Sequence, residues 1–190
     1  GTSHSFDFAY EGQKLENISL AMAGQHQVAN ASLAIMTSLL LQKDYPEVTP
    51  DLIKAALAHA SWLGRTEFLM PNLMIDGAHN NESVKVLIDL LKSEYADKDI
   101  ELLFAAIDTK PIDSMLAQLE SVGDLTVTSF EYPNSVKLDK YPAAYKKVPD
   151  FQTWIKNHVS ADKDKLYVIT GSLYFISQVR KWLLERKSNV

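Results

Sequence analysis

Two short segments of this chain combine side chains that could bind an anionic substrate and move a proton. The segment Met74–Asn80 carries an aspartate, a glycine, a histidine and an asparagine from an apolar run into a predicted helix. The segment Gly64–Glu67, just upstream, adds an arginine. A helix N-terminus is a ready site for anions, and a carboxylate at the end of a strand can accept hydrogen bonds from a ribose diol. These two segments therefore hold the main candidates for a functional site.

Asp76, Gly77, His79 and Asn80 could each have a ligand role or a purely structural one. Asp76 ends a predicted strand, where ligands of open parallel sheets bind, but it could also shape a turn or cap the helix. His79 lies at a helix start, which disfavours protonation, so a neutral ring could accept from an amine or donate to a carboxylate. The alternative for His79 is a loop histidine with satisfied hydrogen bonds. Gly77 permits a positive φ or a close backbone approach, and Asn80 is favoured as the helix N-cap.

Arg65, Ser172 and Asn30 are the remaining candidates. The Arg65 guanidinium could fork onto a phosphate or a carboxylate, whereas the alternative is a solvated arginine paired with Glu67. Ser172 follows Gly171 at another helix start, where it could bind an anion or cap the helix. Asn30 lies on the first turn of an apolar helix and could contact a base or cap that helix.

The composition limits the classes of function. The chain has 190 residues, of which 46% are hydrophobic and 23% charged, so we expect a globular protein with one full domain and a smaller part. The net charge of -5 with scattered basic residues argues against a nucleic-acid or membrane surface, and local groups must hold any anion. The absence of cysteine excludes disulfides and thiolate metal sites. The N-terminal residues lack the apolar core of a signal peptide.

Several catalytic motifs are missing from the sequence. The seven glycines are isolated, so there is no glycine-rich phosphate loop. There is also no nucleophile elbow and no histidine–glutamate metal motif. A nucleotide could be contacted by this chain, but its triphosphate needs groups from elsewhere.

The hydrophobic pattern predicts an α/β fold in two parts, with a linker or hinge at 61–66 between them. The first part, 1–63, is predicted to hold strands at 5–10 and 15–22 and helices at 28–41, apolar nearly all round and therefore buried, and 50–60. The second part, 64–190, is predicted to alternate strands at 72–76, 100–107, 125–130 and 166–170 with helices at 81–95, 111–120, 151–159 and 172–186. Such alternation indicates a mostly parallel sheet flanked by helices. We expect the segments 76–80, 108–110 and 170–172 to share its carboxyl edge.

Four motifs of the chain occur in the same order in folylpolyglutamate synthases, a family of the Mur ligase superfamily that is often bifunctional with dihydrofolate synthase activity. They are Gly24-Gln25-His26-Gln27-Val28-Ala29-Asn30-Ala31, Gly64-Arg65-Thr66-Glu67, Ile75-Asp76-Gly77-Ala78-His79-Asn80 and Ile169-Thr170-Gly171-Ser172-Leu173-Tyr174-Phe175. The resemblance runs from about residue 20 to the end. It implies that 1–63 is the tail of a central ATP-binding domain and 64–190 a Rossmann-like C-terminal ligase domain.

The resemblance implies an ATP-dependent ligase of folate biosynthesis and one-carbon metabolism in the cytoplasm. It would add L-glutamate to tetrahydrofolate, or to dihydropteroate to make dihydrofolate, through an acyl phosphate. Asn30, Arg65 and Asp76 would then contact the nucleotide, while His79 and Ser172 would lie near the incoming glutamate or the terminal phosphate. Arg65 and His79 are the implied catalytic residues. ATP and Mg²⁺ would be required, with the metal ligands and the phosphate loop in the family's N-terminal ATPase region, so the chain is expected to be inactive alone.

Two departures and two alternatives accompany this resemblance. Asn81 stands where the family usually has proline, a small change at a first helical turn. Tyr132-Pro133-Asn134-Ser135 stands where the family often has a Pro-Arg pair, which bears on how an anionic substrate is held. The alternatives are a non-catalytic nucleotide-binding or regulatory module and a Mur ligase acting on a peptidoglycan precursor.

Overall fold

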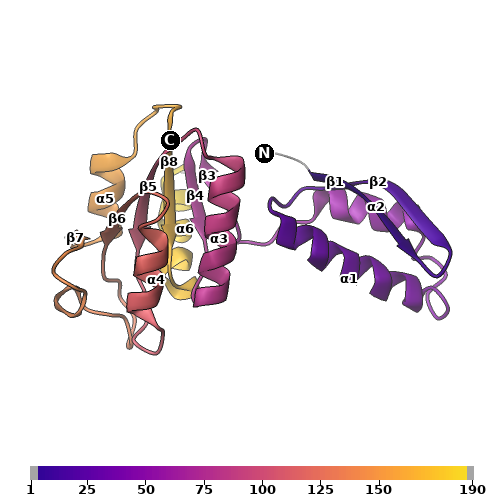
Figure 1. Cartoon of the computed structure of the whole chain (residues 1–190), viewed down its shortest axis with the longest axis horizontal. Helices are drawn as coiled ribbons and strands as arrows, with labels where there is room; N and C mark the ends of the chain where they lie inside the picture. The colour runs from indigo at the N-terminus through magenta and orange to yellow at the C-terminus, as the bar shows by residue number, and fades with distance from the viewer. Residues whose placement is uncertain (1–3, 188–190) are drawn as a thin grey trace. The chain divides into compact units, whose positions relative to one another are not determined.

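The computed structural model describes residues 4–187, which divide between Trp62 and Leu63 into two compact units (Figure 1). In the first unit, β1 (His4–Tyr10) and β2 (Gln13–Leu20) form an antiparallel hairpin. Its two loop residues, Glu11 and Gly12, have φ of 48° and 81°, as a type I′ turn requires. The helices α1 (Gln25–Leu41) and α2 (Pro50–His59) pack against this hairpin, and Thr49 caps α2 by accepting from the Leu52 N–H.

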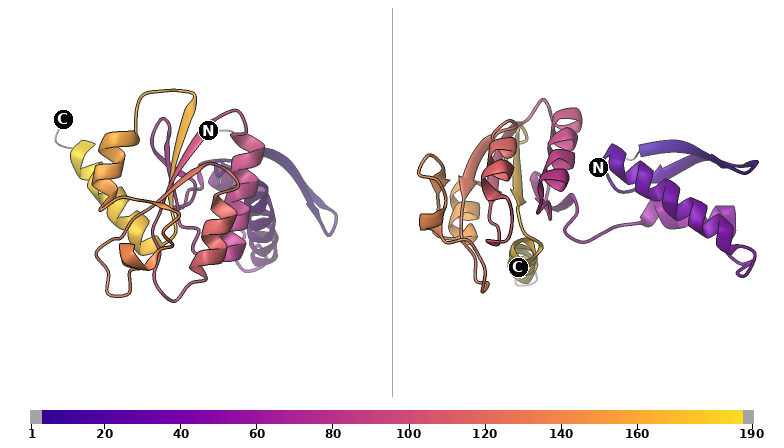
Figure 2. Two further views of the ribbon diagram at one scale, coloured as in Figure 1. Left: turned by 60° about the vertical axis from the view of Figure 1, so that its left-hand side comes forward. Right: turned by 60° about the horizontal axis from the view of Figure 1, so that its bottom comes forward.

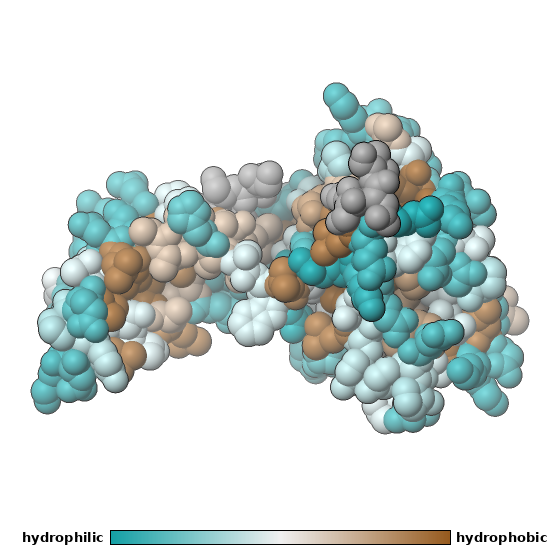
Figure 3. All heavy atoms as spheres, turned by 180° about the vertical axis from the view of Figure 1, so that it is seen from behind, coloured by the Kyte–Doolittle hydropathy of each residue, from teal (hydrophilic) through white to brown (hydrophobic). Residues whose placement is uncertain are grey.

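Helix α1 is buried on one side only, so its predicted all-round burial is wrong. Ala31, Ile35 and Leu39 face the hairpin and α2, whereas Leu33 and Leu40 are 60% and 57% exposed. The space-filling view accordingly shows apolar side chains at the surface of this unit (Figure 3). The reason is that one hairpin and one helix can cover only one face of an apolar helix. The sequence pattern thus describes a helix with apolar side chains on two faces, and the hairpin and α2 cover one of these faces.

The second unit is built on a six-stranded sheet in the order β3-β4-β8-β5-β6-β7. All neighbouring strands are parallel except β3, which is antiparallel to β4. The strands are β3 (Glu67–Met70), β4 (Leu73–Asp76), β5 (Asp99–Phe104), β6 (Asp124–Val127), β7 (Lys146–Lys147) and β8 (Lys165–Thr170). The helices are α3 (Asn81–Glu94), α4 (Ile112–Leu119), α5 (Phe151–His158) and α6 (Leu173–Lys187), with a short 3-10 helix η1 (Leu138–Lys140).

Helices cover both faces of this sheet, as the further views show (Figure 2). Successive strand residues point to opposite faces, so Met74 packs with α3 and α4 while Ile75 packs with α5 and α6. Strands buried on both faces read as continuous apolar runs, which is why the sequence revealed β5 and β8 clearly. The predicted class, a mostly parallel sheet flanked by helices, is confirmed.

The strand ends lie where the sequence predicted, although some element bounds differ. Asp76 pairs with Thr170, and Thr170 with Phe104, so the carboxyl ends of β4, β8 and β5 share one edge. β5 and β6 end three residues before their predicted limits. β3, a four-residue antiparallel edge strand, was not predicted, because its residues do not form a continuous run of buried positions. No helix within residues 4–187 has the length and apolar character to cross a membrane.

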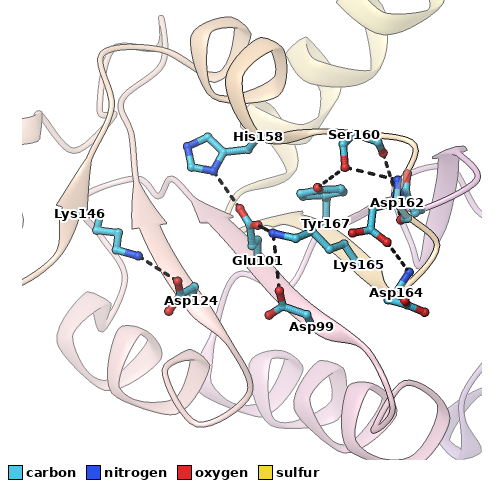
Figure 4. A network of polar contacts seen from close by, with 11 residues as sticks. Asp99, Glu101, Asp124, Lys146, His158, Ser160, Asp162, Asp164, Lys165 and Tyr167 are labelled. Carbon is cyan, nitrogen blue, oxygen red and sulfur yellow. Dashed lines mark hydrogen bonds and ion pairs between the residues drawn. The ribbon is translucent and has the colours of Figure 1, made fainter.

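The amino end of the sheet carries a network of polar contacts (Figure 4). Glu101 accepts from Lys165 Nζ at one oxygen and contacts His158 Nδ1 at 2.8 Å with the other. Burial alone would raise the pKa of Glu101, but the hydrogen bonds from Lys165 and His158 outweigh burial and lower that pKa. This cluster lies far along the strands from the Asp76 turn, so it serves the fold.

Replacing Glu101 with glutamine should make stability less dependent on acid pH. A carboxyl group with a lowered pKa in the folded state stabilises the fold above its ordinary value of 4.5 and loses that contribution as pH falls through the folded pKa. Glu101→Gln should therefore unfold at lower urea than the parent at about pH 7, and the gap should close as the pH falls well below the ordinary value of 4.5. Urea unfolding followed by circular dichroism at several pH values measures this gap. A gap that stays constant over the range would contradict the assignment.

Candidate active site

Asp76, the last residue of β4, accepts hydrogen bonds from two backbone segments, one before β3 and one after β4. Its side chain is 6% exposed; Oδ2 accepts from the Thr66 N–H at 2.8 Å and Oδ1 from the Ala78 N–H at 2.9 Å. Burial raises the pKa of Asp76, against the opposing effects of the Thr66 hydrogen bond and the Arg65 charge. The turn-forming role considered for Asp76 is therefore present. A carboxylate has about four lone-pair sites, so these two hydrogen bonds leave capacity for a ligand.

The segment before β3 is held by a second carboxylate. Glu67 accepts from the Gly64 N–H at 2.7 Å, and the Gly64 carbonyl accepts from the Gly77 N–H at 2.8 Å. Arg180 of α6 in turn donates its Nε to both Glu67 oxygens, at 2.9 and 3.1 Å. The backbone on either side of Arg65 is thus fixed, at Gly64 through Glu67 and at Thr66 through Asp76. This arrangement positions Arg65 in advance of any ligand.

The Arg65 guanidinium has no partner within residues 4–187. The structure excludes the predicted alternative, a pair with Glu67, because Glu67 is engaged by Arg180 and by the Gly64 N–H. The charge of Arg65 does act on Asp76, whose pKa it lowers. A guanidinium without an ion pair, carried by a backbone that is held on both sides, is available to an incoming anion.

His79 presents one ring nitrogen to the chain and leaves the other free. Its Nδ1 lies 2.7 Å from the Gly77 carbonyl oxygen. Because a carbonyl only accepts, the proton is assigned to Nδ1, and in the neutral ring Nε2 is then an acceptor. No residue in the described part of the chain hydrogen-bonds to Nε2. The ring can therefore accept a proton or a hydrogen bond from a ligand amine.

Asn80 is the N-cap of α3, as predicted. Its Oδ1 accepts from the Ser83 N–H at 2.8 Å, and Ser83 Oγ accepts from the Asn80 N–H at 3.1 Å. Together they form a capping box. This fixes the start of α3 directly after His79.

Ser172 lies at the carboxyl end of the neighbouring strand β8. Asp76 and Thr170 are paired in register, and Thr170 Oγ1 donates to the Ala78 carbonyl at 3.4 Å. Ser172 follows two residues later, 3% exposed and immediately before α6. Its hydroxyl forms no hydrogen bond with any residue from 4 to 187, so the capping alternative is not realised.

The structure brings four of the five predicted residues to one edge of the second unit. These four are Arg65, Asp76, His79 and Ser172. Asn30 lies in the first unit, exposed on α1, with its Nδ2 donating to Gln27 Oε1 at 3.2 Å. A groove of 470 Å³ adjoins the segment before β3, lined mainly by apolar side chains together with Gly64 and Arg180.

Within residues 4–187 no group of three or more histidine, aspartate or glutamate side chains is placed to hold a metal ion. The residues described here therefore offer no fit for Mg²⁺.

Comparison with known proteins gives consistent relatives over nearly the whole chain, although no protein-family model matches the sequence. The dihydrofolate synthase/folylpolyglutamate synthase of Bacillus subtilis is 32% identical over 94% of this chain. The folylpolyglutamate synthase of Lacticaseibacillus casei is 29% identical over 95% of it. The chain is homologous to folylpolyglutamate and dihydrofolate synthases. It corresponds to their C-terminal part and spans about 44% of the length of these relatives.

Solved structures share the fold, and a second group of relatives matches about half of the chain. E. coli FolC in complex with ADP superposes with a TM-score of 0.83 over 99% of this chain and 46% of that protein, at 23% identity, which shows the shared fold. A UDP-N-acetylmuramate–L-alanine ligase from Hydrogenobaculum is 33% identical, but over only 52% of this chain. The match to folate-type relatives is thus the more complete one.

Two variants of Glu67 should separate its two structural roles, which sequence reasoning missed. Glu67→Ala leaves the Gly64 N–H without its acceptor and should lower the free energy of unfolding by about 1–3 kcal/mol. Glu67→Gln keeps an acceptor for that N–H but loses the charge that faces Arg180. Because this ion pair is partly exposed, the free energy of unfolding should fall by only about 0.5–1 kcal/mol. Urea unfolding of both variants measures the difference. Equal losses would show that the ion pair, and not the backbone hydrogen bond, holds this segment.

Proposed function

We propose that this chain is the C-terminal part of an ATP-dependent ligase that adds L-glutamate to a folate. The folate would be tetrahydrofolate, in polyglutamylation, or dihydropteroate, in the synthesis of dihydrofolate. The observation that carries the proposal is the 32% identity, over 94% of this chain, to a dihydrofolate synthase/folylpolyglutamate synthase. The placement of Arg65, Asp76, His79 and Ser172 at one edge of the sheet supports it.

In this proposal the terminal carboxylate of the folate is phosphorylated by ATP, and the amine of glutamate then attacks the acyl phosphate. Both steps develop negative charge, so positioned cations and donors matter more than a protein nucleophile. Arg65 would contact the phosphates, while Asp76 and Asn30 would contact the nucleoside. His79 Nε2, which has no hydrogen-bond partner within residues 4–187, would accept a hydrogen bond or a proton from the glutamate amine, and the Ser172 hydroxyl would bind a glutamate carboxylate.

The division of the chain into two units fits this proposal. Residues 1–63 would be the end of the central ATP-binding domain, and the exposed face of α1 would then be covered by the rest of that domain. Residues 64–190 would be the C-terminal ligase domain. The complete protein would be a cytoplasmic enzyme. Its N-terminal part, like that of the relatives, would supply the phosphate-binding loop and the ligands for Mg²⁺. Alone, this chain would bind nucleotide or glutamate weakly and catalyse nothing.

The experiment is an assay of glutamate-dependent ATP hydrolysis by the complete protein. Dihydropteroate, tetrahydrofolate and a muramyl peptide are supplied in separate reactions, because muramate ligases are also relatives. Hydrolysis stimulated by either folate substrate and by glutamate is the expected result. Stimulation by the muramyl peptide alone would replace the folate assignment, and binding of ATP without any turnover would favour a regulatory module.

A further inference from the structure

Thr66, the residue between Arg65 and Glu67, has a strained backbone conformation. Its φ is 43°, in the left-handed region that glycine adopts freely and other residues seldom do. Within residues 4–187 two further residues other than glycine share a positive φ, Glu11 and Asn17, and both belong to the first unit. Threonine is branched at Cβ, which makes a positive φ more costly for Thr66 than for either of them.

Two carboxylates hold this strained turn in place. The Thr66 N–H donates to Asp76 Oδ2 at 2.8 Å, and Asp76 is only 6% exposed. The next residue, Glu67, accepts from the Gly64 N–H and from Arg180 Nε. A strained residue persists only where the surrounding structure fixes it, and strain of this kind is concentrated at functional sites.

The side chain of Thr66 does not compensate for the strain. It is half-buried, and its hydroxyl forms no hydrogen bond with any residue from 4 to 187. A glycine at this position would adopt the same φ without strain and would lose no side-chain hydrogen bond. The greater freedom of glycine in the unfolded chain offsets only part of that gain. Stability alone therefore favours glycine over threonine here.

What threonine supplies is a restricted backbone beside Arg65. On the other side of Arg65, Gly64 has a φ of 73°, and a Cβ there would lie 2.7 Å from Ile176 Cδ1, so that position requires glycine. A second glycine at 66 would place Arg65 between two residues of high conformational freedom. The branched side chain of Thr66 removes most of this freedom, and the hydrogen bond to Asp76 fixes the conformation that is left.

We propose that Thr66 is a positioning residue, whose restricted left-handed turn holds the Arg65 guanidinium where an incoming anion meets it. The role of Arg65 itself rests on the proposed function. Thr66 touches no substrate and acts only through Arg65. A cation that is fixed in advance stabilises the transition state without being ordered during the reaction, so loss of the restriction lowers kcat more than it raises KM.

Thr66→Gly tests this role, because it should raise stability and lower activity together. In urea unfolding of this chain, the variant should unfold at a higher urea concentration than the parent, since the backbone strain is removed. In the complete protein its kcat should fall about tenfold, while KM for ATP and for glutamate should change less than about twofold. A side chain with a purely structural role would not give opposite signs in the two measurements.

Three comparisons complete the test. Thr66→Asn keeps a residue that tolerates the left-handed region and is more restricted than glycine, so its kcat should stay within about twofold of the parent. The matched control is Glu11→Gly, which relieves a φ of 48° in the β1–β2 turn and should raise stability without changing kcat. Introduced into Arg65→Ala, Thr66→Gly should lower kcat no further, because residues that act as one unit are not additive.

The mobility of Arg65 is measured without turnover. ¹⁵N relaxation of this chain should show a lower order parameter for the Arg65 amide in Thr66→Gly than in the parent. An equally rigid Arg65 amide, an unchanged kcat in Thr66→Gly, or a further loss in the Arg65→Ala background would overturn the proposal. So would a Thr66→Gly variant that unfolds at lower urea than the parent.

These outcomes are separable from the ligase assignment. A parent without folate- and glutamate-dependent turnover rejects the proposed function, and the Arg65 relaxation measurement then still decides whether Thr66 restricts Arg65. An active parent whose Thr66→Gly variant is equally active rejects this proposal alone.

Discussion

Under the proposed ligase function, Arg65→Ala in the complete protein is expected to lower kcat by about a hundred- to a thousandfold. The loss corresponds to about 2.7–4 kcal/mol of transition-state stabilisation, by analogy with removal of one oxyanion donor. The structural basis is that the backbone on both sides of Arg65 is held, through Glu67 and Asp76, while its guanidinium has no partner in residues 4–187. Steady-state kinetics with saturating ATP, folate and glutamate measure the change.

The control for this prediction is Arg186→Ala. Arg186 is an exposed arginine that lies 4.6 Å from the centre of the Trp182 ring, far along α6 from Ser172. Its removal should leave kcat within about twofold, since exposed side chains of this kind contribute little. Arg65→Lys keeps the charge and loses the fork, so an intermediate kcat would assign part of the effect to bidentate binding. An unchanged kcat in Arg65→Ala, with folding intact, would remove Arg65 from the mechanism.

The sequence predicted the sheet and the edge that carries the site, because both follow from local patterns. Continuous apolar runs marked β5 and β8, and the turn residues after β4 and β8 placed Asp76 and Ser172 at neighbouring strand ends. The cap at Asn80 was likewise predictable, since its partner Ser83 is only three residues away.

The sequence did not predict the contacts that hold these residues. Glu67 and Arg180 are separated by 113 positions, and nothing local shows that they meet. The same holds for the contact between the segment after β5 and the loop after β6, where the Asp108 N–H donates to the Asn134 carbonyl and the Val136 N–H to the Ala106 carbonyl. The exposed face of α1 shows a second limit of the sequence. Its apolar composition predicts that this face is buried, but it does not identify the element that buries it.

Gly171→Ala is the second substitution with a large expected effect, and here the effect is on stability. Gly171 follows β8 with φ of 119°, a region that L side chains rarely adopt, and a Cβ there would lie 2.3 Å from the Ala105 carbonyl oxygen. That oxygen cannot move aside easily, because the Ala105 N–H donates to the Thr170 carbonyl at 3.2 Å. Backbone strain of about 1–3 kcal/mol adds to overpacking of about 1–3 kcal/mol. We therefore expect a loss of about 2–6 kcal/mol.

Substitutions at two other glycines separate the cost of backbone strain from the cost of a steric clash. Gly12→Ala shares a positive φ, 81°, but its Cβ would meet nothing within 4 Å, so only the strain of about 1–3 kcal/mol is expected. Gly77→Ala would place a Cβ 2.3 Å from Leu173 Cδ2, the end of a half-exposed side chain that can rotate away. The steric clash in Gly77→Ala should therefore cost less stability than the clash in Gly171→Ala. Urea unfolding by circular dichroism ranks the three variants. A loss in Gly171→Ala no larger than in Gly12→Ala would mean that the Ala105 turn yields, and that the β5 and β8 ends are not the rigid support that Ser172 needs.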